Sequence, residues 1–274
     1  MWIKLWALIG LACLFGPREI LAQRQLANYY GGQYRVYVLK HQGMAFKCFD
    51  FNLDGARIEL AYLGEKAGTR LSDWQRRRGE PLCYLAAGFA RDYESGQPLG
   101  ASVERGKVIN RQFDPKMDGL MCISSPARRG GSDVEVLTAA HGFKQKQTEL
   151  IRKMVKIRGS LLQTQLLYAK GTDLKPGPKK YGKKASRRFL AICKDRHGNT
   201  HHVILDLVQA SHLNDAAQKS LEALKRQFAE VEYLFNQDTG AHNVMAAFDP
   251  KGKVIHRGPV ELVYATQLLI YYRP

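Results

Sequence analysis

The stretch RFLAICKDRHGNTHHVILDLV, residues 188–208, decides the fold more clearly than any other part of the chain. Two apolar runs, 189–194 and 201–208, flank a polar segment, 195–199, that contains a glycine. Apolar and β-branched residues on both sides of a short Gly-containing turn are typical of an antiparallel hairpin. The stretch therefore predicts two strands joined by a turn.

Further strands are predicted on both sides of this hairpin. Residues 34–39 (YRVYVL) alternate, which is the pattern of a half-buried strand that places Tyr37 on its polar face. Segments 99–103 and 107–109 flank Glu104-Arg105-Gly106 and predict another hairpin. A turn at Asn52-Leu53-Asp54-Gly55 separates two more strands. The remaining predicted strands are 44–51, 58–63, 233–235, 244–248 and 262–272.

Two helices are predicted among these strands. Residues 144–156 carry apolar side chains at helical spacing, and residues 214–229 do so more clearly. Asn214 is expected to cap the second helix, whose buried stripe holds Ala217, Leu221, Leu224 and Phe228. We therefore expect an α+β fold with mixed, mostly antiparallel sheets and two main helices, in a single domain over residues 23–274.

The first 22 residues have the layout of a secretory signal peptide. Lys4 precedes an eleven-residue apolar run, 5–15, and Ala22 offers a small residue for cleavage. A lipoprotein signal ending at Cys13 is the alternative. No later segment approaches the ~18 uncharged apolar residues of a membrane helix. The sequence predicts an exported protein, periplasmic or secreted.

The chain is strongly basic, with 42 Lys and Arg against 25 Asp and Glu and a formal net charge of +17. This excess favours anionic partners such as cell-envelope polyanions. Residues 170–188 hold eight basic residues beside Pro and Gly, which predicts either an anion-binding flap or a solvated loop. Nucleic acid is an unlikely partner, because Tyr181 is the one aromatic residue in this segment.

No cofactor or metal site is expected. Adjacent His201 and His202 would point to opposite faces of a strand, so they would not share one ion. No CxxC spacing, phosphate-binding loop or serine-nucleophile elbow occurs. The cysteines that follow the signal peptide leave disulfide pairing open, and at least two are expected to be small buried hydrophobes. They are Cys48, Cys83, Cys122 and Cys193.

Six short motifs follow one another in an order that resembles the phosphodiester glycosidase family, which includes the lysosomal uncovering enzyme. They are LAAGF (85–89), GQPLG (96–100), ERGKVI (104–109), AICKDRHG (191–198), NQDTG (236–240) and QLLIYY (267–272). The resemblance spans roughly residues 34–274. It implies cleavage of the bond between the anomeric carbon of a sugar and a phosphate-linked remainder.

The resemblance also implies site residues. Gly88, Phe89, Gly240 and Asn243 match motif positions that would bind substrate, and the guanidinium of Arg188 suits a phosphate group. The chain departs from the family pattern in places. Ala86-Ala87 replaces the family's Asn, and DTGAHN (238–243) replaces Asp-Gly-Gly-Gly-Ser-Ser. Either the substrate differs or catalysis has been lost.

Two residues are candidates for catalysis. Asp238 follows a predicted strand and precedes a glycine, and glycoside hydrolysis needs carboxyl groups as acid and as nucleophile or base. The alternative is an Asp that caps a turn. His242 would act as an acid or base, or is a surface histidine without a role. Asp92 and Glu94 are candidates for a second carboxyl group.

These observations favour an exported glycosidase-like hydrolase that acts on a sugar-1-phosphodiester or a related anionic envelope glycan. The alternative is a non-catalytic binder of anionic glycan or lipopolysaccharide on the same fold. The sequence does not choose the sugar or the oligomeric state.

Overall fold

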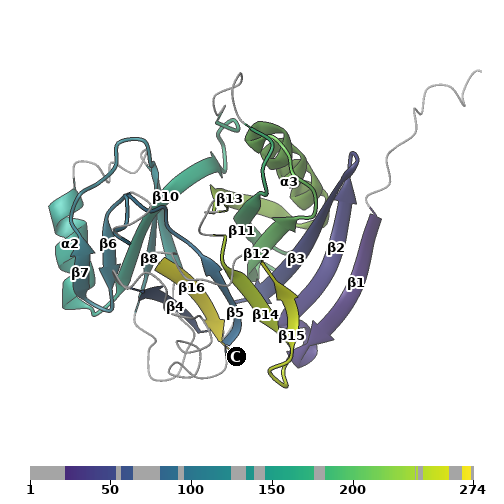
Figure 1. The fold of residues 1–274 in the computed structure, drawn as a ribbon, viewed down its shortest axis with the longest axis horizontal. Helices are drawn as coiled ribbons and strands as arrows, with labels where there is room; N and C mark the ends of the chain where they lie inside the picture. Colours follow the sequence, from purple (N-terminus) through teal and green to yellow (C-terminus); the bar gives the residue numbers. More distant parts are fainter. Residues whose placement is uncertain are drawn as a thin grey trace, which may run out of the picture.

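The chain folds into two antiparallel β-sheets that pack face to face, with α-helices on the outside of the larger sheet (Figure 1). This computed structural model describes residues 22–53, 57–63, 81–91, 96–124, 134–138, 146–175, 183–237, 239, 243–258 and 267–272. The predicted signal peptide lies outside this part of the chain, except for Ala22, which begins the first strand.

The larger sheet has eleven strands. A 3-10 helix, η1 (Tyr30–Gly32), joins the first two. Along the sheet the order is β1 (Ala22–Tyr29), β2 (Tyr34–His41), β3 (Met44–Asn52), β12 (Thr200–Leu207), β11 (Arg188–Lys194), β13 (Glu230–Asn236), β10 (Ser160–Ala169), β6 (Ser102–Glu104) and β7 (Lys107–Asn110). In addition, β8 (Gly119–Ile123) pairs with β10 and with β9 (Val134–Thr138).

The smaller sheet has five strands. Their order is β15 (Val254–Arg257), β14 (Met245–Phe248), β5 (Pro81–Ala86), β16 (Gln267–Tyr272) and β4 (Ile58–Tyr62). The chain therefore passes from the larger to the smaller sheet after β3, where the sequence predicts a turn. Residues 54–56 of that turn lie outside the described residues.

The two predicted hairpins are confirmed. In the first, β11 and β12 pair over their full length, from Lys194 opposite Thr200 to Arg188 opposite Asp206. In the second, β6 and β7 pair across a turn in which Arg105 and Gly106 both have positive φ. Local turn chemistry is enough to specify these strand pairs.

The predicted α+β class is wrong, because the protein is predominantly β. Every strand pairing in the described part of the chain is antiparallel, so the sheets are not mixed either. The sequence reading missed strands such as β5 and β8, whose side chains are all buried. A strand that is buried on both faces lacks the apolar–polar alternation by which strands are recognised.

Helix α3 (Leu213–Gln227) covers the outer face of the larger sheet. Its predicted stripe is buried and packs against β2, β3, β11, β12 and β13. This cover explains why Tyr37 is buried, although the alternation of β2 placed it on the polar face. The predicted cap at Asn214 is wrong, because the helix begins one residue earlier and His212 is its N-cap.

The second helix, α2 (Gln147–Lys156), packs beside β6, β8 and β10. It confirms the helix predicted at residues 144–156, with a later start. In the described part of the chain, no helix is long and apolar enough to cross a membrane.

Other local expectations are also met. His201 and His202 point to opposite faces of β12, where they contact Asp50 and Tyr271 respectively. The four cysteines in the described part of the chain are buried and unpaired, as the interpretation of small buried hydrophobes predicts.

Truncating the buried stripe of α3 tests this arrangement. Leu221 is 4% exposed, so Leu221→Ala is expected to lower the free energy of unfolding by about 2–4 kcal/mol. Leu26 in β1 is 47% exposed, and the matched change Leu26→Ala should cost less than about 0.5 kcal/mol. Urea denaturation measures both. Equal losses in the two variants would contradict the packing of α3.

Candidate functional site

A row of polar side chains ends the apolar core between the two sheets. The apolar core includes Phe49, Leu190 and Ile204. A charged residue stands two positions away from each of them in its strand. Because side chains alternate along a strand, those charged residues face the smaller sheet too. They are Lys47, Asp206 and Arg188, and they lie directly opposite one another across β3, β12 and β11.

Arg188 is the central member of this polar row and is completely buried. Its Nε lies 3.0 Å and its Nη2 lies 2.9 Å from Oδ1 of Asp206. Its Nη1 donates to the backbone carbonyl of Val244, 3.3 Å away, just before β14. A buried guanidinium needs such partners, because leaving a charge unpaired in the interior is very costly. The side chain therefore ties the two sheets together.

Asp206 links this pair to a histidine of the smaller sheet. Its second oxygen, Oδ2, lies 2.8 Å from Nε2 of His256 in β15. Burial alone would raise the pKa of the Asp206 carboxyl, but Arg188 and then His256 outweigh burial and hold that pKa below its usual value. The side chains of Asp206 and His256 are about one-fifth exposed, at 18% and 19% respectively. The carboxylate thus orients an imidazole that solvent reaches.

The polar row continues into β13 and β10. The backbone N–H of Gln237 donates to the carbonyl of Arg188, 3.0 Å away. Thr164 donates to the carbonyl of Asn236 at 3.4 Å, and the amide of Asn236 donates to Gln165 at 2.9 Å. Three buried amide oxygens here accept no hydrogen bond from any residue that the structure describes. They belong to Asn236, Gln237 and Asn243.

The smaller sheet closes the site from the other side. The N–H of Ala86 donates to the same Val244 carbonyl that Arg188 contacts, at 2.9 Å. Two residues further on, a Cβ at Gly88 would lie 2.5 Å from Oε1 of Gln267. Position 88 therefore accepts no side chain unless Gln267 moves. Gln267 also donates to the hydroxyl of Ser102 on β6.

The structure brings Arg188 and Asn243 together, because Arg188 donates to the carbonyl of Val244, the residue after Asn243. Gly88 lies two residues beyond Ala86, whose N–H donates to the same carbonyl, and all three predicted residues are buried. Phe89 is half-buried beside Gly88, and its carbonyl accepts the N–H of Leu99. The other predicted residues lie outside the described part of the chain. They are Asp238, Gly240 and His242, together with Asp92 and Glu94.

Described residues on either side of position 238 are held next to Arg188. Gln237 bonds to the Arg188 carbonyl, and the hydroxyl of Thr239 donates to the carbonyl of Ser186 at 2.7 Å. The chain around the predicted catalytic Asp238 is thus anchored to the strand that carries the buried guanidinium.

Sequence reasoning missed Asp206, His256 and Gln267. The hairpin register contained a signal for Asp206, because pairing Lys194 with Thr200 places Asp206 opposite Arg188. His256 and Gln267 come from the other sheet, and the sequence shows no local pattern that connects them to Arg188.

The site is suited to binding polyhydroxyl groups and to moving protons. Buried amide oxygens accept hydrogen bonds from hydroxyls, and a carboxylate-oriented imidazole is a common acid or base. Among the described residues, no cluster of three or more His, Cys, Asp or Glu side chains could hold a metal ion.

Asp206 offers a test of how this polar row is held. Asp206→Asn leaves the buried Arg188 charge uncompensated, so it should cost about 3–5 kcal/mol of unfolding free energy at pH 7. A carboxyl whose folded pKa is lowered stabilises the protein above its unfolded pKa of about 4, and this contribution is lost as pH falls further. The difference from the parent protein should therefore shrink below about pH 4.

A matched control is available on α3. The side chain of Asp215 is 50% exposed and pairs with Lys219 one turn away, so Asp215→Asn should cost no more than about 0.5 kcal/mol. Denaturant titrations at several pH values measure both variants. A loss at Asp206 that is small, or that does not change with pH, would contradict the proposed ion pair.

No family model and no curated protein matches the chain, but solved structures share its fold. One is the catalytic domain of zebrafish N-acetylglucosamine-1-phosphodiester alpha-N-acetylglucosaminidase, auto-inhibited by its pro-peptide. It superposes with a TM-score of 0.52 at 13% identity, over 95% of this chain and 86% of that one. A hypothetical protein from Synechocystis gives a TM-score of 0.51 at 13% identity over 88% of this chain, which spans 62% of that protein. The fold is therefore similar to that of a glycosidase catalytic domain.

Proposed function

We propose that the protein is an exported hydrolase that cleaves a sugar-1-phosphodiester or a related anionic envelope glycan. One observation carries the proposal. Arg188 and Ala86, the latter in the LAAGF motif, donate to one carbonyl, that of Val244, which follows the predicted substrate-binding residue Asn243. The similarity of the fold to a glycosidase catalytic domain supports it.

In this proposal water replaces the phosphate-linked group at the anomeric carbon. The bond between that carbon and the phosphate oxygen breaks, the phosphate leaves with the remainder, and a water oxygen is bonded in its place. Asp238 supplies the carboxyl group for this step, and His242 assists as acid or base. The reaction requires no cofactor.

The described residues would bind and orient the substrate. The amide oxygens of Gln237 and Asn243 accept hydrogen bonds from sugar hydroxyls. The Asp206–His256 pair is a second source or acceptor of protons, since its imidazole is partly exposed. Arg188 acts as a positioning residue, because its guanidinium is buried against Asp206 and the Val244 carbonyl.

The charge and the N-terminal sequence fit an envelope substrate. A net charge of +17 attracts polyanions such as phosphate-containing glycans. We propose that cleavage after Ala22 releases a protein that begins at Gln23, in the periplasm or outside the cell.

Turnover of a defined substrate tests the proposal. We expect the parent protein to release N-acetylglucosamine from a fluorogenic N-acetylglucosamine-1-phosphodiester. Asp238→Asn keeps the side-chain volume but removes the carboxyl group, so kcat should fall at least ~100-fold while KM changes little. Continuous fluorescence assays measure both constants.

The control is Asp249→Asn in the turn between β14 and β15. The Asp249 carboxylate accepts the N–H groups of Lys251 and Lys253, so it represents the alternative role of a turn-capping aspartate. This variant should keep the parent activity. If the parent releases no sugar but binds anionic glycan in a salt-sensitive manner, the hydrolase proposal fails and the binder interpretation holds.

A further inference from the structure

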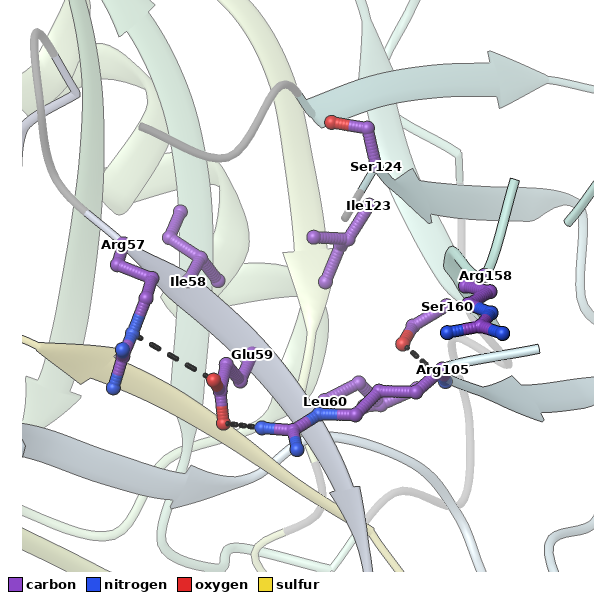
Figure 2. A pocket seen from close by; sticks show the side chains of 9 residues that line it. All are labelled: Arg57, Ile58, Glu59, Leu60, Arg105, Ile123, Ser124, Arg158 and Ser160. Carbon is purple, nitrogen blue, oxygen red and sulfur yellow. Dashed lines mark hydrogen bonds and ion pairs between the residues drawn. The ribbon is translucent and has the colours of Figure 1, made fainter. Parts of the chain in front are cut away.

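A pocket opens at the start of β10, away from the polar row. It has a volume of about 580 Å³, lies along the exposed edge of β4, and is bounded by the β6–β7 turn and the segment that follows α2 (Figure 2). A pocket of this size holds a small organic molecule. Its lining is Arg57, Ile58, Glu59, Leu60, Arg105, Ile123, Ser124, Arg158 and Ser160.

Among the described residues, three guanidinium groups and one carboxylate line this arginine pocket, which gives these side chains a net charge of +2. Glu59 is shared, with Oε2 at 2.5 Å from Nη2 of Arg105 and Oε1 at 3.6 Å from Nε of Arg57. In Figure 2 no hydrogen bond or ion pair joins the Arg158 side chain to the other eight residues. The carboxylate thus leaves positive charge available to an anion.

The backbone presents two of these arginines in an unusual way. Arg105 has φ 46° and Arg158 has φ 52°, which is the left-handed region that favours Gly or Asn. Arg158 directly follows the C-cap of α2, a position where glycine is strongly preferred. Non-glycine residues in this conformation cost of order 1 kcal/mol and are concentrated at functional sites. Local folding therefore does not account for arginine at these positions.

The two turns are also fixed to each other. The N–H of Gly106 donates to the carbonyl of Gly159 at 2.8 Å. A Cβ at Gly106 would lie 3.1 Å from the Val155 carbonyl oxygen and 3.2 Å from the Cα of Arg158. The β6–β7 turn therefore rests on the end of α2, and this contact holds Arg105 and Arg158 at the same pocket. The backbone at both arginines is therefore held in place before any ligand arrives.

We propose that this arginine pocket binds the phosphate group of a small sugar-sized molecule. Guanidinium groups make paired, charge-assisted hydrogen bonds to phosphate oxygens. Ser160 adds a hydroxyl, whose oxygen accepts the N–H of Arg105 at 3.0 Å and whose hydrogen is a donor. The volume exceeds that of a phosphate ion, which leaves room for an attached ring.

The pocket is separate from the site of the proposed reaction. Ser160 begins β10, and Thr164 of the polar row lies four residues further along, or roughly 13 Å at the usual rise per residue. This inference therefore does not depend on the proposed hydrolase activity. The ligand would be a regulator or a second phosphate of an extended glycan, and both share the same phosphate chemistry.

Calorimetric titration of the Asp238→Asn protein tests the inference without turnover. The probe is glucose-6-phosphate, which has no phosphate at the anomeric carbon, with glucose and inorganic phosphate as comparisons. We expect glucose-6-phosphate to bind at least about tenfold more tightly than glucose, and salt to weaken its binding. If inorganic phosphate binds as tightly as glucose-6-phosphate, the pocket is still a phosphate site, but its ligand is the free phosphate ion.

Variants at position 158 locate the binding. Arg158→Gln should weaken glucose-6-phosphate binding at least about tenfold, whereas Arg196→Gln, at an exposed position in the β11–β12 turn, should leave it unchanged. Arg158→Gly should lose binding without a lower melting temperature, since glycine favours this backbone conformation. If glucose binds as well as glucose-6-phosphate, or Arg158→Gln binds like the parent, the inference is wrong.

Discussion

The buried ion pair between Arg188 and Asp206 is the interaction on which the junction of the two sheets depends. A guanidinium with no exposed surface requires compensation, and the larger sheet supplies it from the neighbouring strand. The smaller sheet also contacts the pair, through the Val244 carbonyl and the His256 imidazole. One pair of side chains thus fixes how β14 and β15 lie over β11 and β12, and it marks where the apolar core ends.

A polar layer at that boundary has consequences for function. Apolar side chains fill the space between the sheets but offer a ligand no hydrogen bonds. Buried amides, by contrast, need hydrogen-bond partners. Among the described residues, the amide oxygens of Asn236, Gln237 and Asn243 lack such partners, and these residues flank Asp238 in the sequence. The close approach of Gly88 to Gln267 leaves no room for a side chain at position 88. The arginine pocket, by contrast, lies at the start of β10 and gathers positive charge at two turns.

The sequence predicts those parts of the fold that rest on local chemistry. The β11–β12 and β6–β7 hairpins and the stripe of α3 follow from turn residues and periodicity, and the structure confirms them. Strands β5, β8 and β10 were missed because burial on both faces removes alternation, and the fold class was wrong for that reason. In the site, motif order led to Gly88 and Asn243, and the chemistry of its guanidinium led to Arg188. His256 and Gln267 join them only through packing of one sheet on the other, which no local pattern encodes.

The central claim is that the polar row at the end of the core holds the sugar. A crystal structure of the Asp238→Asn protein with a bound N-acetylglucosamine-1-phosphodiester tests it most directly. We expect the sugar ring to lie beside Gly88 and its hydroxyls to donate to the amide oxygens of Gln237 and Asn243. A ligand bound elsewhere, with these amide oxygens unengaged, would show that the polar row does not bind the sugar.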